Sequence, residues 1–187
     1  MLLATACARL QLALGIFLAA LSPGCGGSAT PPTTPSGSFG TVIAPVPNEG
    51  WTHVPEGSTI AYQHNPPASG PHYPVWLRYE VYTTPMARGY WVHNLEHGGI
   101  VFLHRRDAPA SVVTDLTNAY RSLPADLKCG DARALLTPDA EMPRPVAVVA
   151  ANWRLEADGV DADAIRAFVL AHRDQAPESI CGGGTRP

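Results

Sequence analysis

The sequence lacks three features that would assign it to a broad class at once. It has no run of basic residues, and its formal net charge of −3 argues against a nucleic-acid partner. It has no internal repeat, and 187 residues provide for one ordinary domain with a self-sufficient core. Its apolar N-terminal stretch, residues 10–21, is too short to cross a bilayer as a helix. We therefore expect one folded domain that neither spans a membrane nor binds nucleic acid.

The first 24 residues predict a signal peptide of the lipoprotein type. A lone positive charge, Arg9, precedes the apolar stretch. The segment Leu21-Ser22-Pro23-Gly24-Cys25 resembles a bacterial lipoprotein cleavage site, although Ser22 stands where such sites usually have leucine. We expect lipid on Cys25 and attachment to a membrane of the cell envelope, because the mature lipoprotein form carries several acyl chains. Ordinary secretion and an uncleaved anchor are the alternatives.

Cysteine is scarce, with four residues in the chain. Export would remove Cys7 with the signal and leave Cys25 to the lipid, so the folded domain would keep Cys129 and Cys181. Such a pair in an oxidising compartment predicts a disulfide. Two thiolate metal ligands are the alternative, which is disfavoured because neither cysteine has another Cys or a His two to four residues away.

Composition divides the rest of the chain into a tether, a domain and a tail. Residues 25–48 are rich in Gly, Ser, Thr and Pro, and predict a disordered tether because they cannot bury enough apolar surface to fold. Residues 49–181 predict a single globular domain, and residues 182–187 a flexible tail.

The domain is expected to be α+β, with a small mixed sheet and two or three helices. Its N-terminal half, up to about residue 90, is rich in Pro and aromatic residues, which favour extended segments and turns. Apolar runs and periodicity indicate strands at 78–83, 100–103 and 146–151, and helices at 110–123 and 161–172. Asp161 can cap the second of these helices.

Histidine is concentrated in one part of the chain, where residues 93–97 read His-Asn-Leu-Glu-His. If this segment is helical, His93 and His97 lie on one face. With His72 from a Ser-Gly-Pro-His turn they would supply three imidazoles, a set that suits copper or zinc. The glycines at 98 and 99 would allow close backbone approach or positive φ. The sequence therefore predicts a site for a transition-metal ion.

Three further residues are expected around this ion: Glu96, Asn65 and Met86. Glu96 is expected to orient a histidine rather than to bind the ion itself. The thioether of Met86 would favour copper over zinc. His53, His104 and His172 are isolated in sequence and are expected at the surface or in caps.

Two other interpretations of these residues stay open. Histidines beside Gly and Pro also occur in turns where they only brace a loop by hydrogen bonds, which would make the domain a structural or interaction module of the envelope. His-X-X-Glu-His is also formally the inverted zinc-peptidase motif, with Glu96 as base. The small chain lacks the long downstream helix that supplies the third ligand in those enzymes, so no catalytic residue is assigned.

The chain resembles a known family in segments 65–72, 92–99 and 150–153, which read Asn-Pro-Pro-Ala-Ser-Gly-Pro-His, Val-His-Asn-Leu-Glu-His-Gly-Gly and Ala-Ala-Asn-Trp. This is the bacterial domain-of-unknown-function family numbered 3105, and the resemblance covers about residues 51–178. It implies a small envelope-associated or membrane-tethered domain whose signature is the first two motifs. It implies no activity. The chain departs from the family at Arg78-Tyr79-Glu80, where a more glycine-rich turn is expected.

Overall fold

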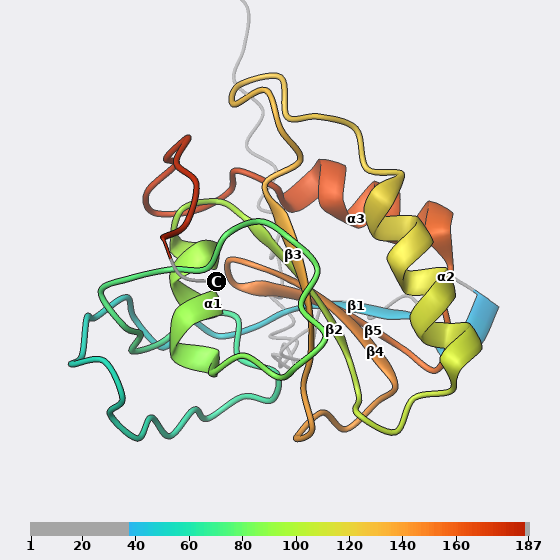
Figure 1. The fold of residues 1–187 in the computed structure, drawn as a ribbon, viewed down its shortest axis with the longest axis horizontal. Coiled ribbons are helices and arrows are strands. Elements are labelled where there is room, and N and C mark those ends of the chain that lie inside the picture. Colours follow the sequence, from blue (N-terminus) through green and yellow to red (C-terminus); the bar gives the residue numbers. More distant parts are fainter. Residues whose placement is uncertain (1–37, 186–187) are drawn as a thin grey trace, which may run out of the picture. The chain divides into compact units, whose positions relative to one another are not determined.

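The computed structural model describes residues 38–185, so the predicted signal peptide, Cys25 and most of the predicted tether lie outside it. A five-stranded mixed sheet with strand order β1-β5-β4-β2-β3 forms the centre of this region (Figure 1). Three α-helices accompany the sheet, which confirms the α+β class. Within the described part of the chain, no helix combines the length and the apolar character needed to cross a membrane.

Strands and helices alternate along the chain up to β3, where three strands follow one another before the last helix. After a 3₁₀ turn at Ser38–Gly40 they are β1 (Val42–Pro45), α1 (Arg88–Glu96), β2 (Ile100–His104), α2 (Ala110–Arg121), β3 (Ala134–Pro138), β4 (Val146–Ala150), β5 (Trp153–Ala157) and α3 (Ala162–His172). The strands predicted at 100–103 and 146–151, and the helices predicted at 110–123 and 161–172, are confirmed with small changes at their ends. The side chain of Asp161 caps α3 by accepting from the N–H of Ala164, as expected.

The strand predicted at 78–83 is wrong. Only Val81 pairs, through an isolated bridge to Leu136 of β3. The chain turns just before that bridge, where the N–H of Glu80 donates to the carbonyl of Arg78. A backbone bent in this way cannot continue a ladder in either direction.

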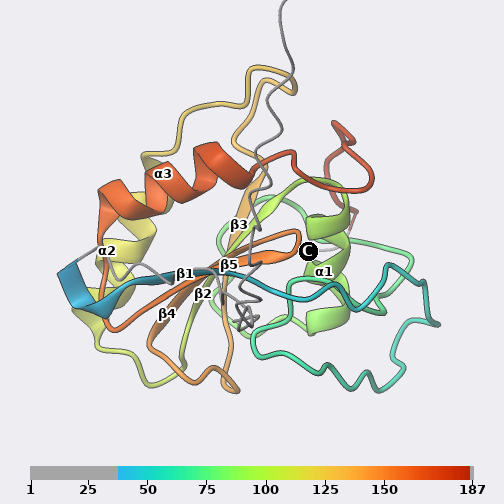
Figure 2. The same cartoon turned by 180° about the vertical axis from the view of Figure 1, so that it is seen from behind.

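The sheet lies between α1 on one face and α2 and α3 on the other (Figures 1 and 2). Each face carries its own apolar cluster. Successive side chains of β2 alternate between them, with Phe102 in the cluster under α2 and α3 and Val101 in the cluster under α1. The irregular backbone between β1 and α1 contributes Val46, Ala68, Leu77 and Tyr82 to the second cluster. Helix α1 is therefore fixed between the sheet and the Pro/aromatic-rich segment, and this position creates the site described below.

The ordered domain is longer than composition predicted at both ends. Strand β1 pairs antiparallel with β5, so the last residues of the tether predicted at 25–48 belong to the sheet. At the other end, the N–H of Thr185 donates to the carbonyl of Trp76, so the described part of the predicted flexible tail contacts the domain. Composition missed β1 because its stability comes from pairing with a strand far along the chain.

A disulfide joins Cys129 to Cys181, with 5.1 Å between the Cα atoms, which confirms the predicted bond. The buried guanidinium of Arg133 lies nearby and donates to Asp126 and Asp174. It also donates to the carbonyl of His97 at 2.9 Å. The C-terminal segment is thus held against the end of α1 by covalent and polar contacts.

Candidate metal centre

Helix α1 carries three candidate residues on one buried face. His93 and Glu96 lie within the helix and His97 caps its end, in the i, i+3, i+4 relation that places side chains together. Each is at most 5% exposed. Apolar residues of the same helix, such as Trp91 and Leu95, are also fully buried. The helix is therefore enclosed on both its apolar and its polar side, which removes the candidate ligands from bulk water.

The two glycines after His97 have the backbone roles expected of them. Gly98 adopts a φ of 81°, which lets the chain leave the helix at once. At Gly99 an added Cβ would lie 2.7 Å from the hydroxyl of Tyr79 and 2.9 Å from the carbonyl oxygen of Asn94. Any side chain at position 99 would thus push against the helix that carries the histidines.

His72 and His53 reach the same place from the N-terminal half. They form a parallel β-bridge, in which the N–H of His72 donates to the carbonyl of Thr52 and that of Val54 donates to the carbonyl of His72. His72 is fully buried. The side chain of His53 is 54% exposed, as expected, but it is not isolated, because its ring centroid lies 4.9 Å from those of His72 and His93. The sequence gives no sign of this neighbourhood.

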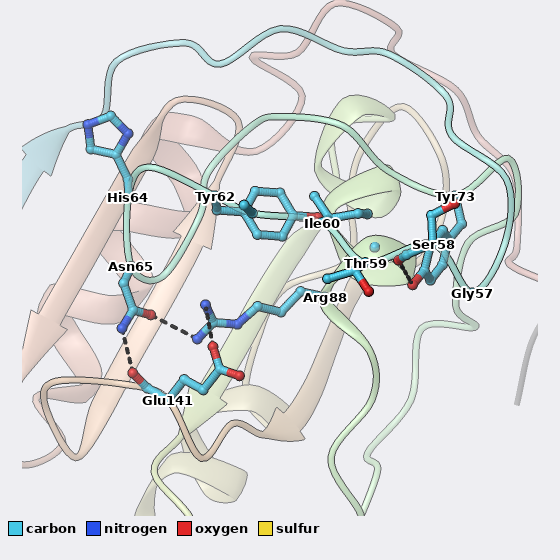
Figure 3. A pocket seen from close by; sticks show the side chains of 12 residues that line it. Gly57, Ser58, Thr59, Ile60, Tyr62, His64, Asn65, Tyr73, Arg88 and Glu141 are labelled. Carbon is cyan, nitrogen blue, oxygen red and sulfur yellow. Dashed lines mark hydrogen bonds and ion pairs between the residues drawn. The ribbon is translucent and has the colours of Figure 1, made fainter.

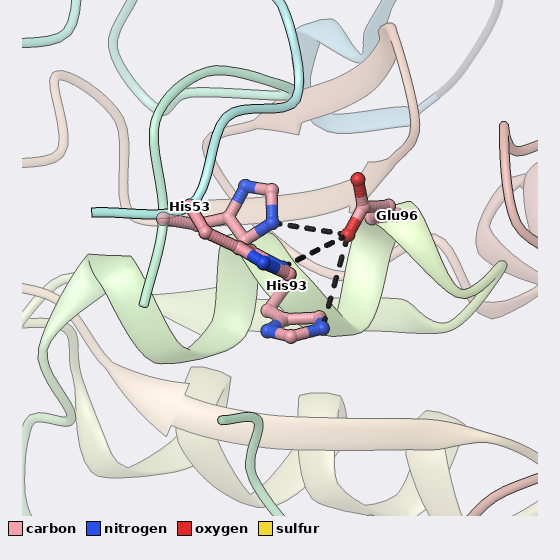
Figure 4. A group of neighbouring side chains, drawn as sticks. His53, His93 and Glu96 are labelled. Atoms are coloured by element: carbon pink, nitrogen blue, oxygen red, sulfur yellow. Dashed lines mark hydrogen bonds and ion pairs between the residues drawn. The ribbon is translucent and has the colours of Figure 1, made fainter. Parts of the chain in front are cut away.

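The rings of His53, His72 and His93 converge on one carboxylate oxygen of Glu96. Oε2 of Glu96 lies 3.0 Å from Nε2 of His72, and 3.8 Å from Nε2 of both His53 and His93 (Figure 4). The four donor atoms are all within 4.8 Å of one another. A tetrahedral zinc ion with bonds of 2.0–2.1 Å holds its donors about 3.3 Å apart. The donors therefore need only small shifts to coordinate one ion. Glu96, expected only to orient a histidine, lies among the possible ligands.

Backbone hydrogen bonds fix the tautomers of the two buried rings. Nδ1 of His72 lies 2.9 Å from the carbonyl oxygen of Gly70, and Nδ1 of His93 lies 2.6 Å from that of Tyr73. A carbonyl only accepts, so each Nδ1 carries a hydrogen. In the neutral ring, Nε2 then presents a lone pair towards the carboxylate of Glu96. When Nε2 of His72 carries a proton, it donates to Oε2 of Glu96 at 3.0 Å; when it does not, a metal cation can take the place of that proton between the nitrogen and the carboxylate.

Burial favours the neutral form of His93. It lowers the pKa of His93 to about 4, mainly by desolvation, and the neighbouring rings of His97, His72 and His53 lower it further. Burial also lowers the pKa of His97, against the opposing effect of Glu178. A neutral imidazole is the form that binds a metal ion, so His93 is in its ligating form at neutral pH.

His97 lies beside this set rather than within it. Its Nε2 is 3.2 Å from Nε2 of His93 and 3.4 Å from Oε2 of Glu178. Of the predicted ligands, the structure thus brings His72 and His93 together, and it groups His97 with Glu96 and Glu178. Glu178 was not predicted, because it lies far along the chain and next to no other candidate. The indole of Trp76 packs against both rings of α1, with centroids 4.9 Å from His93 and 4.4 Å from His97.

The structure gives Asn65 and Met86 contacts with residues other than the four donors. Oδ1 of Asn65 accepts from Arg88, at a cavity of about 640 Å³ that contains none of the four donors (Figure 3). Arg88 itself is paired with the carboxylates of Asp139 and Glu141, so this cavity has no unpaired charge from it. The side chain of Met86 packs against the apolar cluster beneath α1.

The comparisons with known proteins identify a family. A search of curated proteins and a search of solved structures each found no match. The family described as "Protein of unknown function (DUF3105)" matches the chain over residues 53–183, a span that includes every donor of the histidine cluster and both cysteines of the disulfide. The chain therefore belongs to the DUF3105 family.

Proposed function

We propose that this protein binds a transition-metal ion through His53, His72, His93 and Glu96. The observation that carries the proposal is the convergence of three Nε2 atoms on Oε2 of Glu96. The two buried rings are already oriented by Nδ1–H bonds to backbone carbonyls, the arrangement that commonly orients metal-binding histidines.

Zinc suits this set of donors best. Three imidazole nitrogens and one carboxylate oxygen are ordinary zinc ligands, and four donors fill a tetrahedral shell. Copper(I) prefers thiolate and thioether ligands, and the only nearby thioether that the sequence suggested, Met86, packs elsewhere. Copper(II) also binds imidazole and carboxylate ligands, so it is the main alternative to zinc at this site.

The bracing interpretation accounts for only part of the geometry. The bonds from His72 and His93 to backbone carbonyls do tie two loops to α1, but they use Nδ1 alone. Bracing also accounts for the hydrogen bonds of Nε2 of His72 to Glu96 and of Nε2 of His93 to His97, but it does not explain why a third ring, that of His53, points to the same carboxylate. The peptidase interpretation needs Glu96 as a base free of the ion, whereas Oε2 of Glu96 lies among the nitrogen donors. Both observations favour a non-catalytic metal site.

We also propose that the protein is exported and anchored by lipid at Cys25. The pattern of residues 1–25 supports this. The disulfide between Cys129 and Cys181 agrees with an oxidising compartment. The domain would then work at a membrane of the cell envelope, on the periplasmic side or the outer surface.

Metal analysis tests the proposal. Protein purified without added metal is stripped with a chelator and titrated with Zn²⁺, and binding is followed by tryptophan fluorescence, since Trp76 contacts His93. His72→Gln should weaken binding by more than the about 10–100-fold that an outer-shell change costs. His104→Gln is the matched control, because His104 lies at the end of β2 and its ring contacts the carbonyl of Arg105, away from the four donors. Absence of Zn²⁺ and Cu²⁺ binding by the wild type would favour bracing. A zinc-dependent hydrolysis lost in Glu96→Gln, with metal retained, would favour the enzyme.

A further inference from the structure

We infer that the site is binuclear, with a second ion bound by Glu96, His97 and Glu178 beside the first, and the carboxylate of Glu96 bridging the two. This inference rests on the proposed function. It assigns roles to two side chains, His97 and Glu178, that a single ion leaves unused.

The second set of donors is as compact as the first. Ligand atoms of Glu96, His97 and Glu178 all lie within 4.8 Å of one another. Nε2 of His97 is 3.4 Å from Oε2 of Glu178, close to the spacing of about 3.3 Å that two ligands of one zinc ion have. Three protein donors leave room for a solvent ligand, as in sites that keep an open position.

The hydrogen bonds of His93 and His97 give the two rings different roles. Nδ1 of His93 donates to Tyr73, so its Nε2 carries a lone pair, and Nε2 of His97 lies 3.2 Å away. Without metal, His97 can donate to that lone pair. Once an ion occupies the lone pair of His93, His97 loses this acceptor, and its Nε2 faces the carboxylate of Glu178. A second cation between Nε2 of His97 and the carboxylate of Glu178 would bind to both.

Charge also favours a shared carboxylate. Two divalent ions in one cluster repel strongly unless anionic ligands lie between and around them. Glu96 and Glu178 supply two negative charges, and Glu96 is the one residue common to both sets of donors. Two-metal sites in proteins have ions about 3.5–4 Å apart, a separation that one carboxylate spans.

The second set is held in place by the fold. The N–H of Glu178 donates to the carbonyl of Glu96 at 3.0 Å. Arg133 donates to the carbonyls of both His97 and Ile180, and the disulfide at Cys181 follows directly. The exposed ligands lie one in each set: the side chains of His53 and Glu178 are each 54% exposed. Each ion thus has one ligand through which it can enter from solvent.

Zinc stoichiometry tests this inference. The chelator-stripped, full-length protein is titrated with Zn²⁺ and analysed by native mass spectrometry and calorimetry. We expect two ions per chain in the wild type and one in Glu178→Gln, with the affinity for the remaining ion unchanged. Glu141→Gln is the control, because Glu141 is an exposed glutamate that pairs with Arg88 outside both sets, and it should retain two. Glu96→Gln should lose the second ion and weaken the first by about 10-fold or more.

The outcomes are distinguishable. One ion in the wild type, with no change in Glu178→Gln, would overturn the binuclear site and leave the proposed function standing. Two ions in both proteins would overturn the role of Glu178 and with it this second site. No bound ion in the wild type would overturn the inference together with the proposed function.

Discussion

His53 and His72 lie side by side because their main chains form a parallel bridge, and their rings meet edge to face at 89°. The bridge pairs an exposed histidine with a fully buried one. It therefore adds a donor atom at the solvent side of the proposed metal site, whose other donors, His93 and Glu96, are buried. His53 is the donor of this set that substitution can remove with the least disturbance of packing.

His53→Gln should weaken zinc binding by about 10-fold or more while leaving stability nearly unchanged, since exposed positions typically tolerate change within about 0.5 kcal/mol. Zinc titration and urea unfolding of the metal-free variant would measure the two effects. His64→Gln is the control, because His64 pairs with Glu49 outside the cluster. Equal loss of affinity in both variants would argue against a ligand role for His53.

The metal-free protein should lose stability as pH falls from about 6.5 towards 4. Burial lowers the pKa of His93 to about 4 in the folded state, so the unfolded chain, with the ordinary value of about 6.5, takes up the proton first. The stability from neutral His93 is full above pH 6.5 and is lost progressively below it, by about 3 kcal/mol at most. Urea unfolding at pH 7 and pH 4.5 measures the loss. His93→Gln should show a smaller loss, and an equal loss in both proteins would contradict this account.

Removal of the disulfide should destabilise the domain by about 4 kcal/mol, the chain-entropy estimate for a closed loop of this length. The bond joins Cys129 to Cys181, with a sequence separation of 52. The double variant Cys129→Ser/Cys181→Ser should therefore unfold at lower urea than the oxidised wild type. The wild type with added reductant should shift to the same midpoint. Coincident curves for all three samples would show that the loop is held by other contacts.

Lipid attachment is expected at Cys25, as the residue pattern before it indicates. Cells grown with a labelled fatty acid should incorporate the label into the wild type and not into Cys25→Ser. Cys7→Ser is the control, since Cys7 lies within the predicted signal and should not affect labelling. Equal labelling of the wild type and Cys25→Ser would remove the anchor from the proposal.

Local signals in the sequence predicted much of the fold. Helix α3 could be located because its cap, Asp161, and its apolar period are contained within its own residues. His93 and His97 could be related because their spacing matches one helical turn. Strand β1 could not be found, since its pairing with β5 connects opposite ends of the domain.

The residues of the candidate site could be predicted only in part, because several of them come together through contacts between distant parts of the chain. His53 joins the cluster through a backbone bridge, and Glu178 through the contacts of a C-terminal segment. Neither contact can be predicted from the residues that neighbour His53 or Glu178 in sequence. The orientation of Glu96 was also hidden, because it depends on where His72 lies after the chain has folded. Residue type and helical spacing predicted a metal site around α1, whereas tertiary packing determines which residues lie in the candidate site.

The two outer strands of the sheet also affect how copies of this domain behave when crowded. The segment 80–82 occupies both backbone groups of Leu136 in β3, by donating from Tyr82 and accepting at Glu80. At the opposite edge, β1 has four residues and ends at Pro45, which has no N–H to donate. Short, interrupted or covered edges are poor templates for strand addition. Neighbouring copies of the described domain should therefore resist edge-to-edge aggregation even at high local concentration.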